Sequence, residues 1–336
     1  MTRRQRVVAI SASAGAAAAA LIIGLIVAFS GSPAPAPAAP PASTARLLSP
    51  FTGEPVPALG PVLAVKIDNI KEARPSTGLR SADIIYVLPV EGGLSRLMAV
   101  FSSRFPPVIG PVRSAREDDL ELLRQFGRPA FAYSGATPHL LPFVHRAPIV
   151  DLYAGLGNVA SAYFRNSKRV APHNLYARSA ALLADAHGAS KARDIGFRFG
   201  PQPSGGQATA SYSVSYPAAS FTFRWSASAG RWLVWMDGAP TLATEGGQLG
   251  GSTVIIQYTQ ITTSRFLEAG SRPPYAVSIG SGRAVVLRNG QEFTVRWSRP
   301  SADGGTTYTL PDGRRMLFAP GQVWVVLAAA PKPGNG

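Results

Sequence analysis

The chain contains no cysteine, and this absence excludes several classes of protein. Disulfide-stapled domains, thiolate catalysis, lipid attachment through cysteine, and zinc or iron–sulfur sites built on thiolates all require that residue. Lysine and histidine are also scarce: only five of the 33 basic residues are lysines, and there are four histidines. The remaining basic residues are 28 arginines, so the positive charge of this protein is almost entirely guanidinium charge.

What is present indicates a folded, basic protein. The chain has 336 residues, 46% of them hydrophobic, which is enough for one or two folded cores. The 33 basic residues against 18 acidic ones give a net charge of +15, a balance that often accompanies nucleic-acid binding. No run of basic residues follows the first six, however, and the excess is spread thinly along the chain. We therefore predict no nucleic-acid partner, and we expect no cofactor.

The N-terminus is typical of a membrane anchor. Three arginines lie within the first six residues, and residues 7–29 then run for 23 positions without a charge. About 20 apolar residues span a bilayer, and flanking arginines stay on the cytoplasmic side. We predict a single-pass anchor within residues 1–30, with the N-terminus cytoplasmic and the body extracytoplasmic in the cell membrane. A signal peptide cleaved near Ser30, followed by secretion, remains the alternative.

Residues 31–49 form a spacer rich in proline and alanine, which favours an extended polyproline II chain. Two folded segments follow, residues 50–200 and 208–330, separated by a linker rich in proline, glycine and serine. We expect an α+β protein. Its first segment is an α/β-type domain with a mixed sheet and about three helices, and its second is a mostly antiparallel β domain.

The first segment alternates apolar runs with helical patterns. A Ser114–Glu117 capping box and three acidic residues in the first turn predict a helix over 116–126. Thr137 and Pro138 predict a second helix start, and Gly188 ends a third helix. The predicted strands cover 62–67, 83–88, 94–102 and 130–133, and the third helix covers 178–187.

The second segment reads as short strands joined by turns such as Asn289-Gly290. It predicts a sandwich or a partly closed barrel. Its five tryptophans could form a sugar platform, but their position on amphipathic strands favours packing in the core. The predicted strands cover 211–216, 221–225, 232–236, 253–258, 276–279, 284–287, 292–297, 306–310, 315–318 and 323–327.

Residues that could carry chemistry gather between positions 68 and 116, at predicted strand ends and turns. Arg113, Ser114 and Arg116 surround a predicted helix start, where free backbone N–H groups attract anions. Arginine guanidinium groups bind phosphate or carboxylate with two parallel hydrogen bonds. This segment therefore predicts a site for a ligand that bears phosphate, uronate or another carboxylate.

The other ligand-binding candidates have a structural alternative. The acidic ones can simply form ion pairs with nearby arginines, and the best histidine, His173 beside Asn174, can brace its loop. We predict no metal site, since His139 and His145 do not share a helical face, and no known catalytic motif is present. Catalytic residues are therefore unassigned, and the remaining candidates are Asp68, Asn69, Arg74, Asp83, Glu91 and Arg96.

Several short segments along the chain match a known family: Ile67-Asp68-Asn69, Ala73-Arg74-Pro75, Gly78-Leu79, Ala82–Tyr86, Val90–Gly93, Arg96-Leu97, Ile109–Arg116, Pro172-His173-Asn174, Val254–Gln257, Gly280-Ser281-Gly282 and Leu317–Trp324. Together they closely resemble the YerB-like family of bacterial extracytoplasmic proteins. That family consists mostly of lipoproteins with two domains of unknown function, so the resemblance implies an envelope location and a two-domain layout. The lipid-bearing cysteine of the family is missing here near Ser30, which favours the protein anchor.

A second, weaker likeness joins Arg80–Ile85 and Ala99–Arg104 to the LytR-CpsA-Psr enzymes, which transfer glycopolymers from polyprenyl pyrophosphate to peptidoglycan. Those enzymes carry an Arg-Ser-Asp motif, which Ala82 interrupts in the first segment here. Their second motif ends in an acidic residue, and Phe105 stands at that position.

Two hypotheses follow. In the first, the protein is not an enzyme but binds an anionic cell-wall polymer, a lipid-linked intermediate or an envelope protein through the arginine-rich helix start. In the second, it is a phospho- or glycopolymer-transferase-like enzyme that acts on a pyrophosphate-linked lipid. There Arg74, Arg96 and Arg113 would hold the pyrophosphate, while Asp68, Asp83 or Glu91 would bind a metal or act as base. The second hypothesis requires these six side chains to meet in one pocket.

Overall fold

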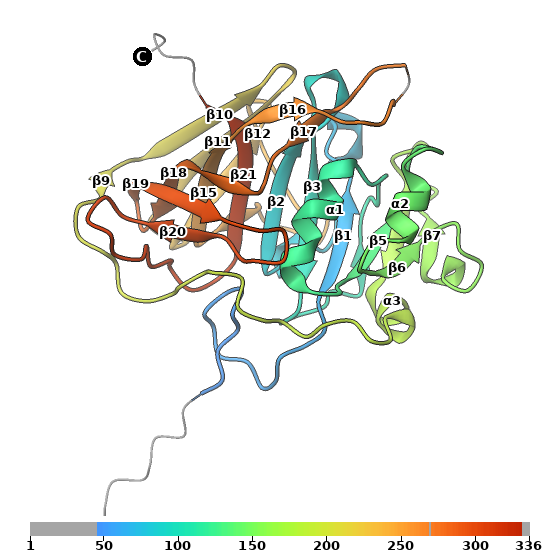
Figure 1. Ribbon diagram of the computed structural model, residues 1–336, viewed down its shortest axis with the longest axis horizontal. Coiled ribbons are helices and arrows are strands. Elements are labelled where there is room, and N and C mark those ends of the chain that lie inside the picture. Colours follow the sequence, from blue (N-terminus) through green and yellow to red (C-terminus); the bar gives the residue numbers. More distant parts are fainter. Residues whose placement is uncertain (1–45, 269, 331–336) are drawn as a thin grey trace, which may run out of the picture. The chain divides into compact units, whose positions relative to one another are not determined.

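One mixed sheet of 11 strands runs through both halves of the chain (Figure 1). The computed structural model describes residues 46–268 and 270–330, and the segment Ala45–Gly336 forms one compact unit. In spatial order the strands are β20 (Thr307–Thr309), β19 (Gln291–Arg299), β18 (Gly280–Arg288), β15 (Thr253–Thr259), β21 (Val323–Ala329), β2 (Ile84–Pro89), β3 (Ser95–Phe101), β1 (Leu63–Ile67), β5 (Ala130–Tyr133) and β6 (Val150–Tyr153), with β9 (Gln207–Ala208) paired to β19.

The last strand of the chain joins the two halves. β21 lies between β15 and β2 and is parallel to both, with Val323 opposite Thr253 on one side and Ile84 on the other. The sheet of the segment 50–200 therefore continues directly into the sheet of the segment 208–330.

Alternating side chains build a core on each face of this sheet. In β1, Leu63, Val65 and Ile67 lie in one core, while Ala64 lies in the other, and all four are fully buried. Strands buried on both faces read as continuous apolar runs, which explains why these segments are so hydrophobic.

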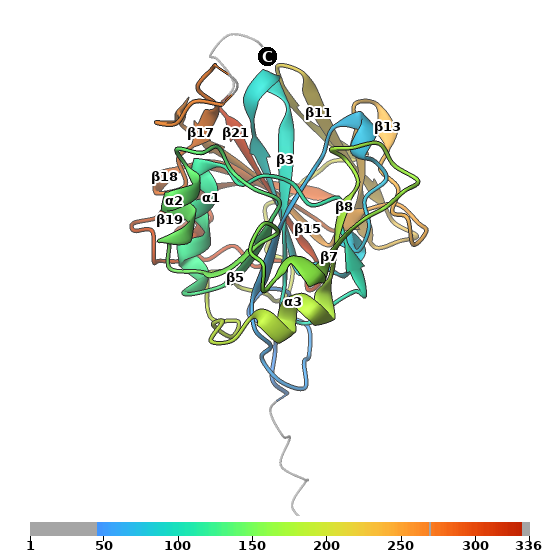
Figure 2. The ribbon, with the colours of Figure 1, turned by 90° about the vertical axis from the view of Figure 1, so that its right-hand side faces the viewer.

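Different elements cover the two faces (Figure 2). On one face lies a second, five-stranded sheet, which gives the C-terminal half a sandwich-like arrangement, together with a three-stranded sheet and α3. On the other face lie α1, α2 and a hairpin. The bounds are β10 (Ser211–Tyr216), β11 (Ala219–Ser226), β12 (Arg231–Met236), β13 (Ala239–Pro240) and β14 (Gly250–Gly251); β4 (Val108–Ile109), β7 (Tyr163–Arg165) and β8 (Leu175–Arg178); α1 (Glu117–Leu123), α2 (Leu141–His145) and α3 (Ser179–Asp185); and the hairpin β16 (Ile261–Thr263) with β17 (Pro274–Ala276).

The predicted α+β class is confirmed, with three α-helices in the described part and mostly antiparallel strands in the second half. Trp232, Trp297 and Trp324 are buried in the core, as expected, whereas Trp225 and Trp235 are half-buried.

Three local predictions are wrong. The cap of α1 is not the pair Ser114–Glu117: the N-cap is Arg116, whose backbone N–H donates to the Asp119 carboxylate at 2.7 Å. Glu117 instead accepts hydrogen bonds from Ser264 in the hairpin, a tertiary contact that overrides the local motif. The second helix begins later than predicted, at Leu141, although Thr137 does cap the preceding turn: its Oγ accepts a hydrogen bond from Leu140 N–H at 3.4 Å. Residues 315–318 make only isolated bridges and form no strand.

Within the described ranges, no helix is long and apolar enough to cross a membrane. The predicted anchor over residues 7–29 and most of the predicted spacer over 31–49 lie outside those ranges. At the end of the spacer, Ser49 is already buried.

Candidate functional site

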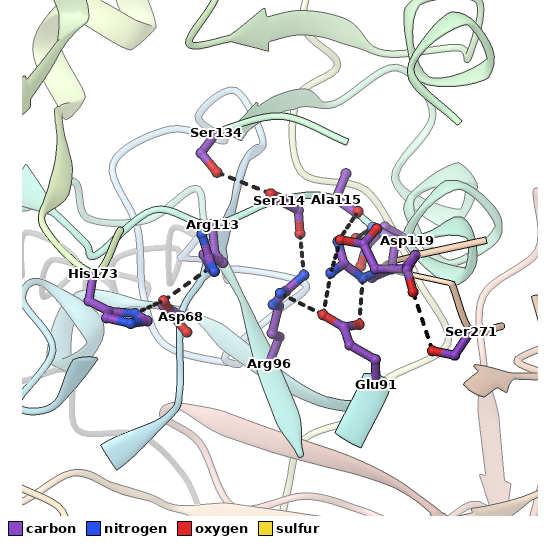
Figure 3. Close-up of polar contacts among 12 residues, drawn as sticks. Asp68, Glu91, Arg96, Arg113, Ser114, Ala115, Asp119, Ser134, His173 and Ser271 are labelled. Atoms are coloured by element: carbon purple, nitrogen blue, oxygen red, sulfur yellow. Dashed lines mark hydrogen bonds and ion pairs between the residues drawn. The ribbon is translucent and has the colours of Figure 1, made fainter. Parts of the chain in front are cut away.

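Most candidate residues meet at one edge of the sheet, where β1, β2 and β5 end (Figure 3). These three strands run in the same direction, so their carboxyl ends share that edge, which is the usual place for binding sites in open sheets. Asp68 follows β1, Glu91 follows β2, and Arg96 lies at the start of the antiparallel strand β3.

The segment 110–116 crosses this edge and is fixed there by backbone hydrogen bonds. Arg113 N–H donates to the carbonyl of Lys66 at 2.8 Å, and Ser134 N–H donates to the carbonyl of Arg113 at 3.0 Å. The segment thus runs between the ends of β1 and β5. Its position brings Arg113 and Ser114 beside residues that are far away in the sequence.

At one end of the cluster, Asp68 holds both a histidine and an arginine. Its Oδ2 lies 2.7 Å from His173 Nδ1 and 3.2 Å from Arg113 Nε, and its carboxylate is buried. The contact with His173 is a hydrogen bond that orients the imidazole ring, whereas the contact with Arg113 Nε is an ion pair without hydrogen-bond geometry. The structure gives no partner to His173 Nε2 or to the two terminal nitrogens of Arg113 among the described residues.

At the other end, Glu91 binds two arginines. Its carboxylate accepts hydrogen bonds from Arg96 NH2 at 3.0 Å and from Arg116 Nε at 2.9 Å, and Arg116 NH2 also bonds to it. Burial alone would raise the pKa of Glu91, but the hydrogen bonds from Arg116 and the charge of Arg96 lower it to about 2. Burial and the nearby charge of Arg116 lower the pKa of Arg96 to about 10.

The hydrogen-bonding groups of these two arginines are directed at the protein itself. Arg116 NH1 donates to the carbonyl of Ala115 at 2.8 Å, and its NH2 lies 3.1 Å from Glu268. Arg96 NH1 donates to the carbonyl of Ser114 at 3.1 Å. Both side chains are nearly inaccessible to solvent, whereas Arg113 is 25% exposed. Of these three arginines, Arg113 is the one that faces outward.

A second buried ion pair lies beneath the site. Lys66 Nζ in β1 is 2.6 Å from Asp119 in α1, and neither side chain is exposed. The neighbouring Asp118 is also buried, and one of its carboxylate oxygens has no hydrogen-bond partner in the described part of the chain. Burial, and then the charge of Asp119, raise the pKa of Asp118 to about 7.

Other candidates lie at the margin of the cluster. Asn69 Nδ2 donates to Ser95 Oγ at 2.9 Å, and Arg74 NH2 donates to the carbonyl of Asn69 at 2.7 Å. Arg74 NH1 reaches away to Asp237, 2.8 Å distant. Asn174 accepts a hydrogen bond from Arg165 at 2.7 Å, which braces the loop beside His173.

Asp83 is not part of the site. It precedes β2, at the opposite end from Glu91, and its Oδ2 accepts backbone hydrogen bonds from Ser102 and Ser103 at 2.6 and 2.9 Å. Burial raises the pKa of Asp83 to about 6. The six side chains of the transferase hypothesis therefore do not meet in one place.

Two residues of the site were missed from the sequence. Ser134 directly follows β5, and its Oγ lies 3.4 Å from Ser114 Oγ; its place after a buried strand was a usable signal. Glu268 comes from the hairpin region of the other half and reaches Arg116 only through the tertiary fold. No sequence pattern marks it.

Metal ligands do not gather at this edge. Over residues 46–268 and 270–330, no group of three or more histidine or acidic side chains is placed to hold a metal ion. The arrangement can bind an anion through Arg113, with a hydrogen bond from His173 beside it.

The fold and the site define an α+β protein with an open mixed sheet and a polar cluster at the carboxyl ends of its strands. The chain belongs to the family described as "Protein of unknown function (DUF3048)". Its N-terminal domain model matches residues 51–193, and its C-terminal domain model matches residues 212–325.

Two comparisons lead to the same relative. The chain is 34% identical over 142 residues to the Bacillus subtilis (strain 168) protein named "Putative lipoprotein YerB", an alignment that covers 41% of this chain and 42% of that relative. The alignment thus spans less than half the length of the curated relative. The crystal structure of the YerB protein from Bacillus subtilis matches with a TM-score of 0.70 and 22% identity, covering 85% of this chain and 97% of that one. The predicted YerB-like membership is confirmed.

Proposed function

We propose that this protein is a membrane-anchored extracytoplasmic binding protein that holds an anionic group of a cell-envelope ligand at Arg113. The location is supported by the apolar segment 7–29, by the arginines before it, and by the lipoprotein named among its relatives. The chemistry is supported by the site at the carboxyl ends of the strands.

The observation that carries the proposal is the state of Arg113. Its Nε lies 3.2 Å from the buried Asp68 carboxylate, its side chain is 25% exposed, and its two terminal nitrogens have no partner among the described residues. An arginine held in this way loses little conformational entropy when it binds, and its two terminal nitrogens fit the two oxygens of a carboxylate or phosphate. His173, on the same carboxylate, can add a hydrogen bond to the bound anion.

The site differs from the arginine-rich helix start that the sequence predicted. Arg116 is engaged by Glu91 and Glu268, and α1 has only seven residues. Arg113 is therefore the ligand-facing arginine, and Arg96 and Arg116 are structural.

The test compares two single variants of the full chain in detergent micelles. Arg113→Gln removes the outward guanidinium group, while Arg104→Gln removes an exposed arginine of equal charge whose side chain is 67% exposed. We expect Arg113→Gln to weaken retention on purified cell-wall sacculi or on phosphatidylglycerol vesicles about tenfold, because one charge-assisted bidentate contact contributes roughly 1.5–3 kcal/mol. Arg104→Gln should behave as the unaltered protein.

The two probes distinguish the source of the anion, since sacculi carry wall polymers and the vesicles carry lipid headgroups. Equal retention of the two variants on both probes would refute the proposal.

The anchor has its own test. We expect the mature protein in membranes to keep its N-terminal arginines, as measured by intact-mass spectrometry, and to resist extraction by high salt. A mature form that begins after Ser30 would instead establish the secreted alternative.

A further inference from the structure

We infer that the C-terminal half carries a second anion site, a shallow trough over β18 and β19 that accepts a strand of an anionic polysaccharide. The trough lies in the region of β18, β19 and β20, five strands away from β1 in the order of the sheet (Figure 1). It shares no residue with the Arg113 cluster, so it does not rest on the function proposed above.

The central observation is a pair of arginines placed directly opposite each other. Arg283 in β18 and Arg296 in β19 are partners in the antiparallel register, and both side chains are exposed. Directly opposed residues in such a ladder have Cβ atoms about 4.5–5.5 Å apart, and like charges at this position destabilise a sheet. Two arginines at opposed positions of the ladder are therefore unfavourable on their own, and an anion bound by both would offset their repulsion.

Among residues 46–268 and 270–330, no carboxylate pairs with either arginine. Arg296 NH2 donates to Ser281 Oγ at 2.6 Å, and the guanidinium carbon of Arg283 lies 5.0 Å from the ring centre of Tyr258. In the described part of the chain, neither arginine forms an ion pair. Both groups are held in place by neutral partners, and their remaining nitrogens can bind a ligand.

Two adjoining hollows give the site the form of a trough. One, of about 470 Å³, is lined by both arginines together with Thr294 and Thr309. The other, of about 500 Å³, shares Gly282 and Arg283 with the first and extends past Tyr258 to Gln260. No acidic side chain lines either hollow.

The lining favours a sugar chain with anionic groups. Hydroxyl and amide side chains such as Thr294, Thr309 and Gln260 can hydrogen-bond sugar hydroxyls, while the arginine pair binds a carboxylate or phosphate with its two forks. The sugar chain cannot extend in both directions. At one end the next hollow, of about 260 Å³, is lined by Glu292 and Asp312, whose carboxylates repel an anionic polymer. An anionic strand therefore extends from the arginine pair toward Tyr258.

The experiment measures binding of the full chain in micelles to three defined probes by titration calorimetry. Short galacturonate oligomers carry carboxylates, poly(glycerol phosphate) carries phosphates, and neutral dextran serves as the uncharged control. We expect one of the two anionic probes to bind, with an affinity that falls as salt concentration rises, and dextran not to bind. Absence of binding to both anionic probes would overturn the inference.

The variant Arg283→Gln/Arg296→Gln should bind the anionic probe at least about tenfold more weakly, whereas Arg283→Lys/Arg296→Lys should retain part of the affinity. The control Arg104→Gln/Arg224→Gln loses the same charge at exposed positions elsewhere and should bind normally. If both glutamine double variants lost the same affinity, the loss would come from the change in net charge alone, and the site would be rejected.

The melting temperature of the ligand-free protein distinguishes an arginine pair that binds a ligand from one that stabilises the fold. If the pair exists for binding, its removal relieves repulsion, so the melting temperature of the free Arg283→Gln/Arg296→Gln variant should stay equal or rise. A lower melting temperature would identify the pair as a structural feature and contradict the inference. Loss of polymer binding in Arg113→Gln, with normal binding in this double variant, would assign the polymer to the other site.

Discussion

At the scale of single residues, the surroundings of each arginine decide its role. Arg116 and Arg96 share Glu91 and are nearly inaccessible, while Arg113 touches Asp68 and faces outward. The sequence identified all three as candidates, because guanidinium groups near strand ends suit anions. It could not distinguish them, since the carboxylates that engage Arg116 come from positions 91 and 268.

Glu91 leads to a prediction on acid stability. Its pKa is lowered to about 2 in the folded protein, so its carboxylate stabilises the fold above the ordinary pKa near 4.5, and this contribution is lost as the pH falls from 4.5 toward 2. Glu91→Gln should lower the free energy of unfolding at pH 7 by roughly 3 kcal/mol, because it removes the carboxylate that two buried arginines share and leaves Arg116 with Glu268 alone. Chemical denaturation from pH 7 to pH 3 measures this.

As the pH falls from 7 to 3, the stability of Glu91→Gln should also decrease less steeply than that of the unaltered protein. A parallel pH dependence in both proteins would contradict the assigned role of Glu91.

For Asp118 we predict the opposite dependence of stability on pH. Its pKa is raised to about 7, so the folded state binds a proton that the unfolded state releases above about 3.8, and stability falls as the pH rises from 3.8 to 7. We expect Asp118→Asn to stabilise the protein at pH 8 by of the order of 2–4 kcal/mol, and by much less at pH 4. The amide oxygen can still accept the hydrogen bond from Ala276 N–H.

Denaturation at the two pH values tests this, with Asp185→Asn in α3 as a control variant. Equal stabilisation at both pH values would show that desolvation of the charge is not the cause.

At the scale of elements, α1 connects the two halves of the chain through its acidic residues. Glu117 accepts hydrogen bonds from Ser264 Oγ and the Arg265 backbone at 2.7 and 2.8 Å, and Glu121 accepts one from Tyr275 at 2.7 Å. In the sequence, Glu117 looks like one of the first-turn acids that compensate the helix dipole. In the fold, Glu117 and Glu121 hold the hairpin β16–β17 against the helix.

Glu117→Ala should therefore loosen this hairpin. Three interactions with residues 264 and 265 disappear, and we expect the hairpin amides to exchange with deuterium about tenfold faster, while exchange in β1 changes little. Hydrogen-exchange mass spectrometry measures both segments. The control Glu54→Ala removes an exposed carboxylate elsewhere, and an equal effect on the hairpin would argue against a local anchor.

At the scale of the whole molecule, the shared sheet predicts cooperative unfolding. β21 pairs with β2 of one half and β15 of the other, and both cores draw residues from both halves. We expect a single transition, since neither half can bury the edge of its sheet without the other.

All five tryptophans lie in the second half, so their fluorescence reports on that half alone. Hydrogen exchange in β1 and β5 reports on the first half, and the two midpoints in denaturant should coincide. Separate midpoints would show that the segments 50–200 and 208–330 unfold independently.

Ending the chain after Gln322, which removes β21, should abolish both the tryptophan fluorescence and the hydrogen-exchange protection of the folded state.

The sequence by itself determined the elements whose signals are local. The strand over 130–133, the strand over 211–216, the membership of the family and the α+β class all follow from contiguous residues, because periodicity and turn chemistry act over a few positions. It also placed Asp68, Glu91, Arg96 and Arg113 among the candidates, since polar residues at the ends of buried strands stand out.

Only the tertiary structure decided which of these residues meet. The contact of Glu268 with Arg116 and the pairing of β21 with β2 join residues more than a hundred positions apart, and β21 reaches β15 across 70 positions. Strand pairing is governed by long-range packing and hydrogen bonding, which leave no pattern within a short window. The absence of cysteine excluded thiolate chemistry from the start, and among Arg96, Arg113 and Arg116 the fold left Arg113 as the most exposed arginine of the site.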